Sequence, residues 1–115
     1  MSVLTIEVSG SDKKTMTVSL SGRLNAASAP EAKERLKALV KEASINLVLD
    51  LGGLTFIDSS GLASLVSAYK AAIEAGGSVK LARLTSQVAY VFTLTRLDRV
   101  FETYPDPETA VKSFS

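Results

Sequence analysis

A dense apolar run at residues 45–51, with the sequence INLVLDL, limits the possible folds more than any other segment of the chain. Isoleucine, valine and leucine fill five of its seven positions, which is too many for a strand with one face in water. We therefore predict a central strand in a sheet that is covered on both faces. Because segments with helical spacing stand before and after this run, the chain is expected to form an α/β fold.

The chain begins with two stretches in which apolar and polar residues alternate. The first runs from Leu4 to Val8 and the second from Met16 to Leu20, and a period of two is typical of a half-buried strand. The polar stretch 9–14 between them predicts a β-hairpin, and Gly22 is expected to end its second strand.

A helix is predicted after the hairpin. Ser28, with Glu31 three residues later, forms a capping-box signature, and Pro30 is tolerated in a first helical turn. The lysines of this segment lie off its apolar stripe and are expected to be solvated. The stripe consists of Ala32, Leu36, Leu39, Val40 and Ala43.

The segment after the apolar run is expected to be a loop and a second helix. Gly52 and Gly53 predict a loop that ends at Asp58, and helical spacing runs from Gly61 to the Gly76-Gly77 pair. The apolar side of this helix is expected to hold Leu62, Leu65, Val66, Tyr69 and Ile73.

The remaining segment predicts two strands and two short helices. Alternation at 79–83 indicates a strand with Val79, Leu81 and Arg83 on one face. A short helix is expected around 88–92, and a short edge strand is expected at 100–103. Asp106 and Pro107 are a good cap and first residue for a terminal helix. That helix is expected to dock through Ala110, Val111 and Phe114. The order β-β-α-β-α-β-α-β-α predicts one domain over 1–115, a mixed sheet flanked by about four helices.

Composition excludes several classes of function. The 115 residues include 13 Lys and Arg against 12 Asp and Glu, for a net charge of +1, and no His or Cys. Their absence excludes a Cys or His metal site, a Ser-His-Asp triad and a thiol nucleophile. Balanced charge and an aromatic content of 6% argue against direct binding of nucleic acid.

Motifs of enzymes and membrane proteins are also missing from the sequence. It contains no Gly-x-Ser-x-Gly elbow and no phosphate-cradling GxxxxGK[ST] loop, so we predict neither an enzyme nor a cofactor site. Its apolar runs are far shorter than the ~20 residues that span a bilayer. Because the N-terminus also lacks a signal-peptide pattern, we expect a cytoplasmic protein without membrane contact.

Residues 58–61, Asp-Ser-Ser-Gly, stand between the predicted central strand and the next helix. Open α/β sheets commonly place working loops there, and a helix N-terminus favours an anion such as a phosphate attached to a serine. The alternative is that Asp58 or Ser59 is simply the helix N-cap. Composition and spacing do not choose between Ser59 and Ser60 as a modified residue.

Three longer segments relate this motif to a family. They read GRLNAASAPEAKERL, LVLDLGGLTFIDSSGLASLVSAYKAA and GGSVKLARLTSQVAYVFTLTRLDRVFE. Together they resemble the STAS domain of bacterial anti-sigma factor antagonists, over nearly the whole chain, and DLGGLTFIDSSGL is the most specific part. The resemblance implies a β-sheet backed by helices.

The resemblance also implies a phosphorylation switch. Ser59 matches the serine that a partner, both anti-sigma factor and Ser protein kinase, phosphorylates in that family, and Ser60 is the fallback. The unphosphorylated protein is expected to bind this partner and release its sigma factor, and a phosphoserine phosphatase is expected to reset the switch. The expected partner surface comprises Asp58, Ser60, Gly61, Ala63, Ser64 and Ser67, with Arg23 and Asn25 from an earlier loop.

Some alternatives stay open at this point. Asn25 stands where the family commonly has Asp, which removes one negative charge, and it is equally well explained as a turn residue. Since STAS domains also serve in stress-signalling scaffolds and lipid-transport complexes, a scaffold module is the alternative function. The chain is expected to be a monomer, or a weak homodimer that pairs through an exposed edge strand.

Overall fold

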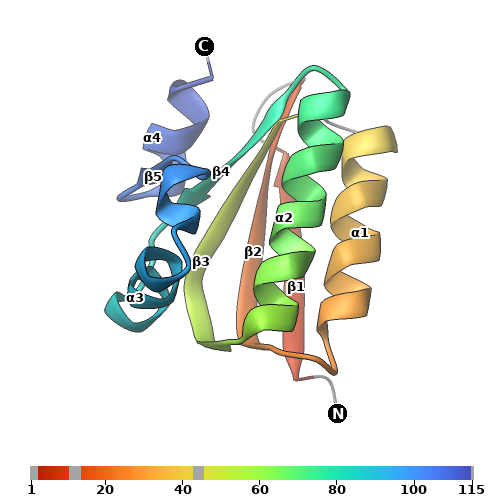
Figure 1. The fold of residues 1–115 in the computed structure, drawn as a ribbon. Helices are drawn as coiled ribbons and strands as arrows, with labels where there is room; N and C mark the ends of the chain where they lie inside the picture. The colour runs from red at the N-terminus through yellow and green to blue at the C-terminus, as the bar shows by residue number, and fades with distance from the viewer. Residues whose placement is uncertain (1–2, 11–13, 43–45, 115) are drawn as a thin grey trace.

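The structure, a computed structural model, describes residues 3–10, 14–42 and 46–114 (Figure 1). Part of the predicted hairpin turn, residues 11–13, lies outside the described residues. So do Ala43 of the predicted helical stripe and Ile45 at the start of the apolar run.

Within the described residues the chain forms five strands, four α-helices and one 3-10 helix, in the predicted order. The elements are β1 (Leu4–Gly10), β2 (Thr15–Leu24), α1 (Ala29–Glu42), β3 (Asn46–Ile57), α2 (Ser59–Glu74), β4 (Ser78–Ala82), α3 (Ser86–Leu94), η1 (Leu97–Arg99), β5 (Thr103–Tyr104) and α4 (Pro107–Lys112). The strands lie in one sheet in the order β1-β2-β3-β4-β5. Only β1 and β2 pair antiparallel, so the predicted mixed sheet is confirmed.

The sheet carries helices on both faces, with α1 and α2 side by side on one face and α4 on the other (Figure 1). In β3, Leu47 and Leu49 belong to the main apolar core with the inner faces of α1 and α2. Val48, between them, packs in a second cluster with Ala82 of β4 and Ala110 of α4. The prediction of a central strand buried on both faces is therefore confirmed.

Both β2 and β3 are longer than predicted, because two expected strand breaks are wrong. The chain runs through Gly52 and Gly53 as a strand to Ile57, and β2 continues past Gly22 to Leu24. The two strands pair in parallel with register shifts on either side of Gly22, whose φ of 100° suits glycine. A side chain at Gly53 would run into that of Ser21, so glycine here allows close strand pairing rather than a turn. The extended β3 carries the chain to Asp58.

The strand β4 also differs from its predicted form. Arg83 lies beyond its end, and both of its faces are buried. Val79 and Leu81 share one face in the main core, as expected, and Ala82 lies in the second cluster. The ammonium group of Lys80 is held under α4, where it donates to Oγ of Ser113 at 2.8 Å and lies 4.2 Å from the ring centroid of Phe114. Burial of this lysine is possible because α4 covers it.

Two apolar positions are more exposed than their spacing predicts. Val8 on edge strand β1 is 39% exposed and Ile73 near the end of α2 is 48% exposed. The α2 positions that pack fully into the core instead include Ala68 and Ala72.

The last predicted strand is shorter than expected. Residues 97–99 form η1, in which Leu97 O accepts from the amides of Val100 and Phe101 at 3.0 Å. Only Thr103 and Tyr104 remain for β5. The Phe101 ring stacks edge-to-face on Phe92 of α3 at 5.8 Å, so this turn anchors α3 to the core.

Candidate functional site

The Asp-Ser-Ser-Gly motif lies where β3 ends and α2 begins. Asp58 has an extended backbone, and its Oδ1 accepts a hydrogen bond from the amide of Gly61 at 3.0 Å. Asp58 is therefore the N-cap of α2, which was one of the two caps, Asp58 or Ser59, that the sequence offered. The Asp58 amide donates to Leu24 O at 3.3 Å, which ties this corner to the end of β2.

Ser59 is the first residue of α2 and is exposed, two positions earlier than the expected helix start at Gly61. Among the described residues, no group forms a hydrogen bond with its hydroxyl. Ser60 is half-buried and lines a groove between α1 and α2. The two serines thus differ in access, which their spacing in the sequence did not reveal.

Gly61 fixes the position of this corner. A Cβ on Gly61 would run into the carbonyl oxygen of Leu24 and would lie 2.9 Å from Cγ1 of Ile57. The helix can approach the strand ends this closely only because residue 61 has no side chain. Gly61 is buried, so a partner would meet it only indirectly.

The loop between β2 and α1 lies beside the same corner and is held by its own side chains. Oδ1 of Asn25 accepts from the amides of Ala27 at 3.0 Å and Ser28 at 3.2 Å, which confirms the turn interpretation of Asn25. Ser28 precedes α1 as predicted, but its hydroxyl turns back and donates to Arg23 O at 2.7 Å. The Arg23 guanidinium lies 4.6 Å from the ring centroid of Phe56.

The two helices enclose a groove of about 350 Å³ next to the motif. Of the predicted partner residues on α2, it brings together Ser60, Ala63, Ser64 and Ser67. Ser64 is only 2% exposed and donates to Gly61 O at 2.7 Å, so it forms the floor of the groove. Arg23, Asn25 and Asp58 do not line it.

Comparisons with known proteins identify the family of the chain. The sequence profile of the STAS domain matches residues 5–110. The chain belongs to the STAS domain family. It is similar to the anti-sigma-B factor antagonist of Bacillus subtilis, with 27% identity over 88% of this chain and 92% of that protein. The antagonist of the same name from Listeria monocytogenes is also 27% identical, over 86% and 87% of the two chains.

A solved structure also resembles this STAS domain. The crystal structure of an anti-sigma factor antagonist from Mycobacterium paratuberculosis superimposes with a TM-score of 0.85 and is 27% identical in sequence. The match covers 96% of this chain and 93% of that one. The predicted fold class and family are therefore confirmed.

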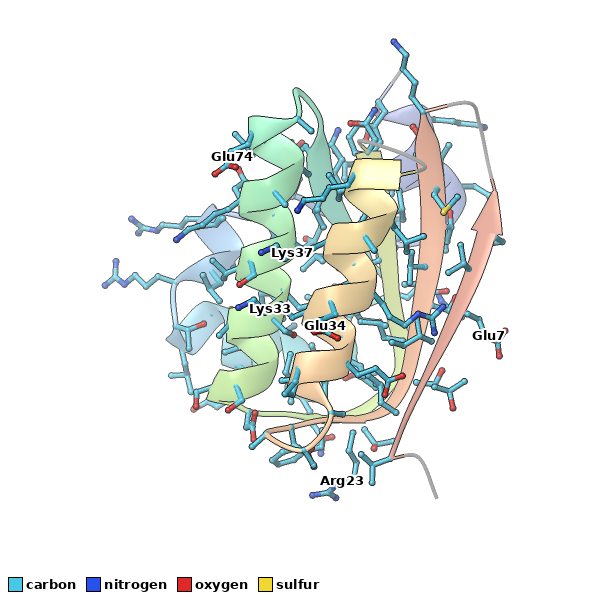
Figure 2. The ribbon with its side chains drawn as sticks, turned by 90° about the vertical axis from the view of Figure 1, so that its right-hand side faces the viewer. Glu7, Arg23, Lys33, Glu34, Lys37 and Glu74 are labelled. Atoms are coloured by element: carbon cyan, nitrogen blue, oxygen red, sulfur yellow. The ribbon has the colours of Figure 1, made fainter. Side chains whose placement is uncertain are left out.

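Sequence reasoning missed the α1 side of the groove. Ala26, Ala29, Pro30 and Lys33 line it, although the lysines of α1 were expected to be solvated only. Figure 2 shows Lys33 between the two helices of the STAS domain. The available signal was topological: after parallel strands both helices begin at the same sheet edge, so their first turns must be neighbours.

Two structural features are absent from the described part of this STAS domain. No cluster of three or more metal-ligating side chains occurs among those residues. Within the same ranges, no helix has the length and apolar content that crossing a bilayer requires. The corner offers an exposed hydroxyl at a helix N-terminus beside a groove.

Proposed function

We propose that this STAS domain is an anti-sigma factor antagonist controlled by phosphorylation of Ser59. The unphosphorylated form binds an anti-sigma factor that is also a Ser protein kinase, and this binding releases the sigma factor. Phosphorylation of Ser59 ends the binding, and a phosphoserine phosphatase restores it. The observation that carries the proposal is the exposed Ser59 hydroxyl at the first position of α2, in a chain similar to named antagonists.

The position of Ser59 explains how such a switch works without unfolding the protein. A phosphate adds about −1.5 to −2 charges at neutral pH. The positive end of the α2 dipole stabilises that charge locally, so the fold is kept. The same charge lies beside the carboxylate of Asp58. When a partner docks, these negative charges must be desolvated and they repel negative groups of the partner, so binding is weakened.

The groove supplies the rest of the proposed contact surface. Ala63 and Ser67 are small, so the backbone of α2 is open to close approach by a partner. Ser60 lies inside this groove, where a kinase reaches it less easily than Ser59, and it is the fallback phosphorylation site. A protein kinase needs ATP, so we place the switch in the cytoplasm.

The test uses the full chain as bait for kinase-type anti-sigma factors from the same cell, followed by titration calorimetry with the purified binding protein. We expect wild type and Ser59→Ala to bind, Ser59→Asp to bind at least tenfold more weakly, and Ser59→Ala to take up no phosphate. Ser86→Ala, which changes an exposed serine at the first position of α3, is the matched control and should bind and be phosphorylated like wild type. If Ser59→Ala is still fully phosphorylated, Ser59 is not the modified serine and the proposal is wrong.

The same experiment separates the proposal from a scaffold role. A scaffold module would enter a stable complex whose affinity is the same for wild type and Ser59→Asp. It would also fail to release a sigma factor from the captured kinase. Either result contradicts the antagonist function.

A further inference from the structure

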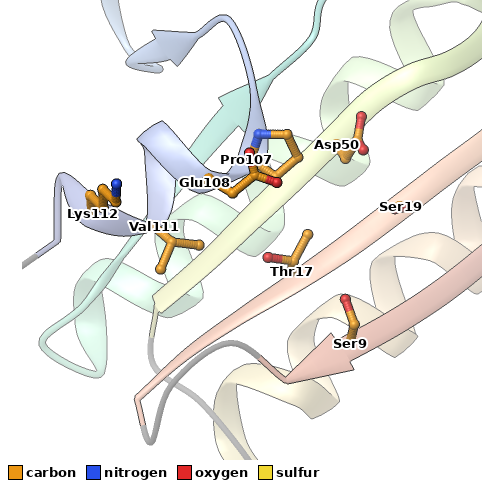
Figure 3. A pocket seen from close by; sticks show the side chains of 8 residues that line it. All are labelled: Ser9, Thr17, Ser19, Asp50, Pro107, Glu108, Val111 and Lys112. Carbon is orange, nitrogen blue, oxygen red and sulfur yellow. The ribbon is translucent and has the colours of Figure 1, made fainter.

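A second concave surface lies on the sheet face opposite α1 and α2. Helix α4 has only six residues and covers only part of this face, which leaves a cleft of about 500 Å³ between α4 and strands β1 to β3. Figure 3 shows its walls: Thr17 and Asp50 point up from the strands, and Glu108, Val111 and Lys112 come from α4. This cleft is separate from the groove beside Ser59.

The most unusual group in the cleft is the carboxylate of Asp50. Its side chain is 10% exposed, in the middle of the buried central strand. Oδ1 accepts two hydrogen bonds, from Nε of Arg83 at 2.9 Å and from the amide of Gly52 at 3.0 Å. Oδ2 accepts none from the residues that the structure describes, and it is accessible from the cleft, because no fully buried side-chain oxygen among those residues lacks a partner.

The fold is arranged so that Asp50 keeps one oxygen available. Arg83 has a φ of 55°, a left-handed conformation that is rare outside glycine, and its guanidinium lies across the sheet surface at Gly52. A Cβ at residue 52 would lie 2.9 Å from the guanidinium, so glycine gives Arg83 the room to reach Asp50. The hydrogen bond and attraction of Asp50 raise the pKa of Arg83.

The other polar groups of the cleft indicate what can bind there. Hydroxyl-bearing Thr17 and Ser19 line the strand side, and Glu108 adds a second carboxylate at the first turn of α4. Lys112 lies at the far end of the cleft, beyond Val111 (Figure 3). The end near Asp50 therefore favours a cationic donor, and the Val111 side chain provides apolar contact for a short aliphatic chain.

We propose that this cleft binds a small organic cation whose guanidinium or ammonium group donates hydrogen bonds to Oδ2 of Asp50. The ligand contacts both α4 and the sheet. Because the cleft and the Ser59 corner lie on different surfaces, ligand binding and phosphorylation are independent inputs to the same domain.

The experiment follows backbone amide resonances of the full chain by NMR during titration with butylguanidinium. N-butylurea, which has a similar shape and no charge, is the matched probe. We expect saturable shifts at Asp50, Ser19 and Glu108 with butylguanidinium only. Asp50→Asn should weaken binding on the order of tenfold, the usual effect of losing a charged hydrogen-bond partner.

A second variant covers the case in which Asp50→Asn does not fold. Ser19→Val places a methyl-bearing side chain in the cleft and keeps the Asp50–Arg83 pair, so it should abolish the shifts. Thr5→Val, an exposed β1 position outside the cleft lining, is its control and should bind like wild type. Ser59→Asp should also bind the probe normally, so this proposal and the phosphorylation switch fail separately.

Three results would overturn the proposal. They are the absence of saturable shifts with butylguanidinium, equal shifts with N-butylurea, and identical titrations of Ser19→Val and Thr5→Val. The first would mean that the cleft holds only water, and the second that its contacts are not ionic. The third would place the binding elsewhere on the molecule.

Discussion

Replacement of Gly61 by alanine tests whether the motif corner depends on the close approach of α2 to the strand ends. Two effects oppose each other. Alanine is favoured over glycine in a helix by about 1 kcal/mol. The added methyl group would run into Leu24 O and lie 2.9 Å from Cγ of Leu24 and Cγ1 of Ile57, and overpacking costs up to about 3 kcal/mol.

The cost of the steric clash should exceed the gain in helix propensity, because the obstructing atom is a backbone carbonyl oxygen that cannot rotate away. That oxygen also accepts the Asp58 amide, so moving it breaks a hydrogen bond of the corner. We expect Gly61→Ala to lower the free energy of unfolding by about 2 kcal/mol. For a chain of this size, that loss lowers Tm by roughly 8 °C.

Urea denaturation followed by circular dichroism measures the effect. With an m value of about 2 kcal/mol/M, the midpoint should fall by about 1 M. Gly10→Ala is the control, because a Cβ there meets no atom within 4 Å, and it should change stability by less than about 0.5 kcal/mol. A Gly61→Ala protein that unfolds at the same or higher urea concentration than wild type would refute the steric argument.

Three further predictions concern other parts of the fold. Asp58→Ala should lose about 1 kcal/mol of stability through loss of the N-cap, whereas Asp58→Asn, which keeps an acceptor, should lose less; equal losses in thermal denaturation would contradict the capping role. Phe92→Ala should cost about 3–5 kcal/mol and Phe92→Leu less than about 1.5 kcal/mol by urea titration, because the ring is fully buried against Phe101. The hydrogen bond from the Thr109 amide lowers the pKa of Asp106 in the folded protein. The ionised Asp106 carboxylate therefore stabilises α4 fully above the unfolded pKa of about 3.9, and this stabilisation is lost as the pH falls below that value and through the lower folded pKa. Wild type should therefore exceed Asp106→Ala in stability at pH 7, and the gap should narrow in acid; a gap that is constant from pH 7 to pH 2 would exclude this carboxylate as the cause.

Much of the fold was predictable because the signals are local. The central strand follows from the density of apolar residues at 45–51, and the N-caps of α2 and α4 follow from Asp58 and Asp106, whose side chains bond amides three residues away. Such features depend on neighbours within one turn of the chain, so a pattern in a short window is sufficient to find them.

Other features depended on residues that only the folded chain brings together. Gly52 and Gly53 have the composition of a turn, yet they lie within a strand because Arg83 and Ser21 occupy the space where their side chains would be. The exposed position of Ser59 and the half-buried one of Ser60 likewise depend on how closely α1 lies beside α2.

The sequence by itself determined the order of elements, the buried central strand and the motif at the start of α2. The tertiary structure alone decided where β2 and β3 end, which of the motif serines is accessible, and that Asp50 faces a cleft under α4. The physical reason is range: hydrogen bonding and hydrophobic periodicity act between near neighbours in the chain. Strand register, helix spacing and the pairing of Asp50 with Arg83 require contacts between residues about thirty positions apart.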